Sequence, residues 1–167
     1  MDGRDREPLT PVAIPRELLA GVYAHAIAAF PAECCGYLTG ATPDAVDAQV
    51  ACRNAQVDGG HPIAPERGAD TGFVIDGAEL FQFARSFDGA RPARIVYHSH
   101  PDGEAYFSTV DRRMAAMAAP DTGPAYPVQH LVVGTAAGAI TSVAQFAWSA
   151  AAGDFVEIAR WREAAAP

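Results

Sequence analysis

The chain has 167 residues, half of them hydrophobic, and carries 20 acidic against 12 basic side chains, for a formal net charge of −8. This length suits one domain with a substantial core, and the hydrophobic fraction excludes a disordered chain. The acidic balance argues against nucleic-acid binding, because the basic residues are scattered apart from one small cluster (Arg91, Arg94, Arg112, Arg113).

The three cysteines, Cys34, Cys35 and Cys52, are odd in number and two of them are adjacent, which does not suggest a disulfide framework. We therefore expect reduced, packed thiols and a cytoplasmic protein. The sequence shows neither a signal-peptide pattern nor a run of about 18 apolar residues, so we expect no contact with a membrane.

The first half of the chain predicts one helix and two strands. A polar lead-in of residues 1–13 precedes a helical pattern that starts at Ile14 and ends at Pro31. Residues 33–40 and 45–52 alternate as strands do, and the irregular stretch of residues 53–72, which contains His61, is predicted to be a loop. The apolar stripe of the helix is predicted to hold Leu18, Leu19, Val22, Ala26 and Ile27, while His25 is interpreted as an ordinary helix residue.

The second half predicts strands interrupted by two further helices. The helices cover residues 77–87, with Leu80, Phe83, Ala84 and Phe87 on one face, and a stretch that opens at Ser108. The strands cover residues 72–76, 93–100, 128–135, 139–149 and 154–161, the last two forming an antiparallel pair. Together these elements predict an α+β, or mixed α/β, domain with about six strands and three helices.

The stretch HSHPDGEAYFSTVD, residues 98–111, concentrates the polar chemistry of the chain. His98 and His100 are two apart on a predicted strand, so both imidazoles lie on one face, while Ser99 points to the other and is given a structural role. Asp111 follows Ser108 by one helical turn, and the loop before it is long enough to bring its carboxylate to the strand end. Two imidazoles, one carboxylate and an open position are typical of a catalytic zinc site.

Two simpler interpretations remain open from these residues alone. A histidine pair at the end of a strand can belong to a solvated edge. Ser108 and Asp111 also have the spacing of a capping box, in which each residue caps the start of the helix for the other.

The complete pattern resembles the signature of the JAMM, or MPN+, metalloprotease family: His-x-His, seven residues, Ser, two residues, Asp. PAECCGYLTG resembles the family's upstream segment and supplies Glu33, and FVID, residues 73–76, resembles its aromatic-Ile-Asp element. The resemblance spans about residues 14–160. It implies an MPN/JAMM-like (cytidine deaminase-like) domain over residues 14–162, with a mixed central sheet flanked by helices, followed by a tail of residues 163–167.

The resemblance also implies a mechanism and a role for each residue. His98, His100 and Asp111 would hold Zn²⁺, and Glu33 would act as general base on a zinc-bound water. Ser108 would donate a hydrogen bond to the oxyanion. The protein would accordingly be a zinc metallopeptidase of the JAMM type.

The substrate is implied by the small stand-alone bacterial members that the chain resembles. These process a ubiquitin-like sulfur-carrier protein by cutting a peptide or isopeptide bond after its C-terminal Gly-Gly, and a homodimer is left open. Two alternatives stand beside this expectation: a non-catalytic MPN-type interaction module, and a zinc amidohydrolase that acts on a small molecule.

Overall fold

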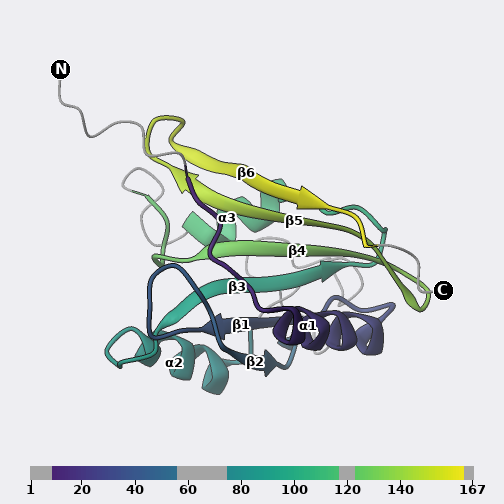
Figure 1. Cartoon of the computed structure of the whole chain (residues 1–167), viewed down its shortest axis with the longest axis horizontal. Helices are drawn as coiled ribbons and strands as arrows, with labels where there is room; N and C mark the ends of the chain where they lie inside the picture. Colours follow the sequence, from purple (N-terminus) through teal and green to yellow (C-terminus); the bar gives the residue numbers. More distant parts are fainter. Residues whose placement is uncertain (1–8, 56–74, 117–122, 164–167) are drawn as a thin grey trace.

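A mixed six-stranded sheet with the strand order β2-β1-β3-β4-β5-β6 organises the computed structural model, which describes residues 9–55, 75–116 and 123–163 (Figure 1). The expected combination of about six strands and three helices is confirmed within this described part. Its elements are α1 (Arg16–Ala29), β1 (Cys35–Thr39), β2 (Ala48–Cys52), α2 (Gly77–Ser86), β3 (Ala93–His100), α3 (Thr109–Ala116), β4 (Gln129–Ala136), β5 (Ala139–Ser149) and β6 (Asp154–Trp161).

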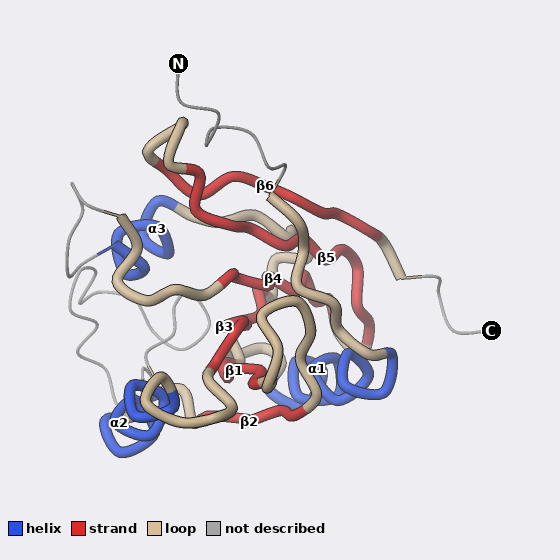
Figure 2. The backbone as a smooth tube through the Cα atoms, turned by 60° about the vertical axis from the view of Figure 1, so that its left-hand side comes forward, coloured by secondary structure: helices blue, strands red, loops and turns tan. Residues whose placement is uncertain are grey.

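The centre of the sheet is the pair β3 and β4, which run parallel, whereas every other neighbouring pair is antiparallel. A parallel pair needs a crossover connection, and α3 lies on that connection. Helix α1 covers one face of the sheet, while α2 and α3 lie over the other (Figure 2). Both faces of β3 are therefore buried, and its residues are buried along the strand except for Arg94, which is half-buried.

Helix α1 packs on the sheet through a narrower stripe than the sequence predicts. Val22 and Ala26 are fully buried, but Ile27 is 39% exposed, so its assignment to the stripe was wrong. Five residues after Val22, Ile27 is rotated about 140° around the helix, at the edge of the contact. His25 is not isolated, since its Nδ1 lies 2.7 Å from the hydroxyl of Tyr97, which also accepts a hydrogen bond from Gln49.

Two further expectations need correction. Strand β2 begins at Ala48 and not at residue 45, because its partner β1 ends at Thr39, opposite Ala48. In α2 only Phe83 is buried, whereas Leu80 is 40% exposed and Ala84 is also exposed, so the helix packs through one edge. Of the expected strand at residues 72–76, Ile75 and Asp76 are described, and Ile75 forms an isolated bridge with Asn54; residues 72–74 and His61 lie outside the described part.

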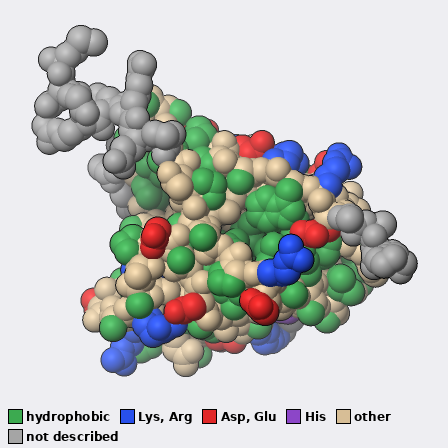
Figure 3. Space-filling view, in the orientation of Figure 1, with side chains coloured by type: hydrophobic (Ala, Val, Ile, Leu, Met, Phe, Trp, Pro, Cys, Tyr) green, Lys and Arg blue, Asp and Glu red, His purple; other side chains and the backbone are tan. Residues whose placement is uncertain are grey.

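None of the helices in the described part of the chain is long and apolar enough to cross a membrane. On the face that Figure 3 shows, basic and acidic side chains are interspersed.

The three cysteines are free and buried, as predicted. Burial raises the pKa of Cys34 to about 11 and that of Cys52 to about 12, so these thiols stay protonated and unreactive at neutral pH.

Gly134 of β4 is packed against the backbone of Gly103 in the loop that follows β3. A Cβ atom at this position would lie 2.7 Å from the carbonyl carbon of Gly103 and 2.8 Å from Oγ of Ser142. We expect Gly134→Ala to lower the free energy of unfolding by about 1–3 kcal/mol, as overpacking commonly does. Chemical denaturation measures this change. Gly77→Ala is the matched control, because a Cβ there meets nothing within 4 Å; equal stability of the two variants would contradict the packing argument.

Candidate metal site

His98 and His100 lie at the C-terminal end of β3 on the face that α2 and α3 cover. Their Nε2 atoms are 3.1 Å apart, as expected for residues two apart on a strand, and both side chains are buried. The interpretation as a solvated strand edge was therefore wrong. The two histidines instead present their nitrogens to the same interior point.

Asp111, in the first turn of α3, brings a carboxylate to these two nitrogens. Its Oδ2 lies 3.1 Å from Nε2 of His98 and 3.3 Å from Nε2 of His100. The capping box is formed as well, because Ser108 N donates to Asp111 Oδ2 and Asp111 N donates to Ser108 Oγ, both at 3.0 Å. The two interpretations of this spacing are thus compatible, and the cap fixes the carboxylate in its place.

Glu33 reaches the same point from the segment before β1. Cys35 is paired with His98 in the antiparallel register of β1 and β3, so a residue two positions earlier faces His100. Accordingly, Glu33 Oε1 lies 3.8 Å from Nε2 of His100. Glu33, His98 and His100 each offer one potential ligand atom, and these three atoms all lie within 4.8 Å of one another.

The segment that carries Glu33 is fastened to its neighbours through the backbone. Cys34 N donates to Ser99 Oγ at 2.8 Å, and Ser99 N donates to Cys34 O at 3.1 Å. Asn54 Nδ2 donates to the carbonyl of Glu33 at 3.0 Å. Ser99 therefore has the structural role expected from its position: it points away from the histidines and holds the carboxylate-bearing segment to the strand.

The tautomer of His100 follows from its second nitrogen. Nδ1 lies 3.1 Å from the carbonyl oxygen of Glu104, and a carbonyl only accepts hydrogen bonds. Nδ1 therefore carries the proton, and a neutral His100 directs the lone pair of Nε2 toward His98 and Asp111. Hydrogen bonding of the second nitrogen to a fixed acceptor is typical of histidines that bind metals.

The loop that carries the Glu104 carbonyl is itself held by the last two strands. Ser142 Oγ accepts from Ala105 N at 3.0 Å and donates to Gly103 O at 3.1 Å. Arg160 donates to Ala105 O at 2.6 Å. These residues, which the sequence did not single out, act through the backbone, and no side-chain motif marks them in advance.

The electrostatics of the site favour an ionised carboxylate and shift the pKa values of the two imidazoles in opposite directions. Burial alone would raise the pKa of Asp111, but His98 and His100 outweigh it and hold that pKa well below its usual range. Complete burial lowers the pKa of His98, against the opposing effect of Asp111. The pKa of His100 is raised instead: burial disfavours its charged form, but the carboxylates of Asp111 and Glu33 outweigh burial. Asp111 and His98 thus have the protonation states in which they bind a metal ion, and a metal would displace the Nε2 proton of His100.

The donor set fits a cation. His98 Nε2, His100 Nε2 and Asp111 Oδ2 are between 3.1 and 3.3 Å from one another. Ligands at about 2.0–2.1 Å from a tetrahedral ion are spaced by about 3.3 Å.

Comparison with known proteins places the chain in a family. Residues 15–150 match Prok-JAB, the prokaryotic homologs of the JAB domain. No curated protein matches the sequence.

Solved structures share the fold. A protein from Desulfitobacterium hafniense superposes with a TM-score of 0.57 and 21% identity, over 86% of this chain and 87% of its own. A protein from Salinibacter ruber gives a TM-score of 0.53 and 24% identity, over 86% of both chains. The family match covers most of the chain and confirms the resemblance noted in the sequence: this chain belongs to the Prok-JAB family.

Proposed function

We propose that the chain is a zinc-dependent peptidase or isopeptidase. The observation that carries this proposal is the convergence of His98, His100 and Asp111 on one buried point, with the carboxylate of Glu33 beside it. A purely structural role for this cluster would not explain why two imidazoles and two carboxylates are buried together. A buried cluster of this kind is a recognised mark of catalytic sites.

Zinc is the ion that the donor set favours, because two imidazoles and one carboxylate are a common catalytic zinc set and leave one position open. Zinc bound there would supply Lewis acidity and lower the pKa of water to roughly 7. His98, His100 and Asp111 are assigned as its ligands. Asp111 is preferred to Glu33 because its oxygen lies at 3.1–3.3 Å from the two nitrogens, whereas that of Glu33 lies 3.8 Å from His100.

Glu33 is assigned as the general acid and base. Its side chain is 4% exposed, and its backbone is held by Asn54, so its carboxylate has a fixed position next to the cluster. In hydrolysis it would take the proton of the attacking water and deliver a proton to the leaving amine. A carboxylate that stood farther out in solvent would be poorly placed for both transfers.

Ser108 is assigned to the oxyanion. In the capping box its Oγ is the acceptor for Asp111 N, so this bond leaves the hydroxyl proton for another acceptor. The same helix start thereby orients the hydroxyl while the carboxylate of Asp111 faces the histidines. One such donor is typically worth roughly 10²–10³ in rate.

The proposed substrate is the C-terminal tail of a ubiquitin-like sulfur-carrier protein, cut after Gly-Gly. The four groups of the site are each at most 8% exposed, so the reacting bond has to enter a confined space. Glycines suit such a space because they have no side chain and let the backbone approach closely. The carrier itself is the substrate that the resemblance noted in the sequence implies.

The experiment that tests this proposal is cleavage of a carrier protein extended by a short peptide after Gly-Gly. We expect one cut after the second glycine, abolished by a chelator and restored by zinc, and blocked when that glycine is replaced by valine. Cleavage of unstructured peptides without regard to glycine would contradict the carrier substrate. Tight binding of the carrier without any cleavage would favour an interaction module, and turnover of a small amide alone would favour an amidohydrolase.

A further inference from the structure

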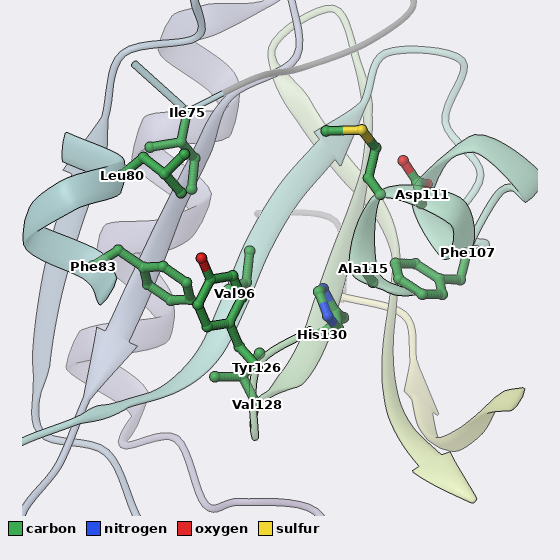
Figure 4. A pocket seen from close by; sticks show the side chains of 11 residues that line it. Ile75, Leu80, Phe83, Val96, Phe107, Asp111, Ala115, Tyr126, Val128 and His130 are labelled. Atoms are coloured by element: carbon green, nitrogen blue, oxygen red, sulfur yellow. The ribbon is translucent and has the colours of Figure 1, made fainter. Parts of the chain in front are cut away.

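A pocket of about 130 Å³ lies between α2 and α3, beside the candidate metal site. Figure 4 shows its walls: Leu80 and Phe83 on one side, Phe107 and Ala115 on the other, with Asp111 at its rim. Val96 of β3 and Val128, just before β4, line it as well. The pocket is thus almost entirely apolar, and it shares Asp111 with the metal site.

Besides Asp111 at the rim and the hydroxyl-bearing ring of Tyr126, one further polar side chain belongs to this lining. His130 of β4 is paired with Val96 of β3 and is 8% exposed. No residue in the described part of the chain forms a hydrogen bond with its imidazole, and its Nδ1 is fully buried. Its neighbours are rings: the centroids of Phe107 and Phe155 lie 4.8 and 5.1 Å from its own.

A buried imidazole without a partner is unusual, since buried polar groups in proteins are almost always hydrogen-bonded. Burial lowers the pKa of His130 to about 3, so the ring is neutral and has one donor and one acceptor nitrogen. An aliphatic or aromatic residue would pack among these rings without that deficit. The position is therefore better explained by a ligand that supplies a hydrogen bond than by packing.

The dimensions and walls of the pocket suit a single aromatic ring. A cavity of roughly 150 Å³ lined by aliphatic and aromatic side chains is large enough to hold benzene. Phe83 and Tyr126 contribute an edge-to-face pair with centroids 4.8 Å apart, and Phe107 lies on the opposite side. Aromatic walls favour an aromatic occupant, because edge-to-face and offset contacts add to the burial of its area.

We propose that this pocket is a substrate subsite for a ring that carries a hydroxyl group, such as a tyrosine side chain, with His130 as the residue that selects the hydroxyl. The assignment of the occupant to a substrate rests on the proposed peptidase function. The affinity of the pocket for such a ring does not rest on that function, because binding of the ring requires neither metal nor turnover.

The binding part of the proposal is tested with p-cresol and toluene, which differ by one hydroxyl. Nuclear magnetic resonance titration of the full chain follows the methyl groups of Val96, Ala115 and Val128. We expect both compounds to shift these methyls, with p-cresol bound roughly 3- to 10-fold more tightly, the range that one hydrogen bond gives. His130→Leu should abolish this preference while toluene still binds, and His130→Gln, which keeps hydrogen-bonding groups, should retain it.

Two results would overturn the subsite. One is the absence of a preference in the unaltered protein, whether both rings bind equally well or neither binds; the other is a preference for p-cresol that survives in His130→Leu. Thermal unfolding separates binding from a structural role, because His130→Leu loses no hydrogen bond within the described part and is expected to melt no lower than the unaltered chain.

The substrate part is tested by cleavage. Carrier tails that keep Gly-Gly and have tyrosine or phenylalanine at one of the other positions within four residues of the cut are compared by kcat/KM. At one position tyrosine should be preferred to phenylalanine, and His130→Leu should remove that preference. Ring binding as expected, together with no tyrosine preference at any position, would reject the substrate assignment. Absence of all cleavage would instead reject the peptidase function and leave the p-cresol result intact.

Discussion

Glu33→Gln is expected to lower kcat by roughly 10²-fold or more while zinc content and stability stay close to those of the unaltered protein. Glutamine keeps the size of the side chain but cannot accept a proton from water at neutral pH. The backbone contacts of residue 33 with Asn54 and of Cys34 with Ser99 do not involve the carboxylate, so the segment should keep its place. Single-turnover cleavage of the carrier measures the rate, and elemental analysis measures the zinc.

The matched control is Glu104→Gln. Glu104 is exposed, and it contacts His100 only through its carbonyl oxygen, so the variant removes one negative charge near the site without removing a proton acceptor from it. We expect almost unchanged turnover. Loss of zinc from Glu33→Gln would make Glu33 a ligand, an arrangement that its clustering with His98 and His100 also permits. Near-normal turnover would require another base.

The elements that the sequence predicted best are those in which the order of apolar and polar residues reflects which side chains are buried. The bounds of β3, β5 and β6 agree with the predicted runs, because these strands have clear apolar patterns ended by turns or polar residues. The shared face of His98 and His100 follows from strand alternation alone. Such features depend only on the order of residues within one element.

Features that depend on how elements meet were beyond a single sequence. Only the family resemblance implied that Glu33 lies beside the histidines, because its approach to His100 requires the register in which Cys35 faces His98, and residue patterns within single elements do not encode that register. His130 was not singled out, because within VQHLVVGT it reads as one position of a buried strand. Its significance comes from the space between α2 and α3, and helix spacing is set by tertiary packing.

Alanine in place of Asp111 is expected to lower zinc affinity by more than roughly 100-fold and to abolish cleavage. Loss of a residue that only orients a ligand typically costs 10–100-fold, so loss of a direct ligand should exceed that range. The carboxylate also accepts the hydrogen bond of Ser108 N, so this variant removes half of the capping box at the same time. The effect on zinc has to be separated from the effect on the helix.

Ser108→Ala makes that separation, because it removes the other half of the capping box and leaves the carboxylate in place. Both variants should lose stability by about 0.5–2 kcal/mol in the absence of metal, the usual range for a lost helix cap. Only Asp111→Ala should lose zinc, as measured by competition with a chromogenic chelator. Ser108→Ala should keep zinc but cleave roughly 10²–10³-fold more slowly, since it lacks the oxyanion donor. Equal zinc affinity in the two variants would remove Asp111 from the ligand set and reduce its role to the helix cap.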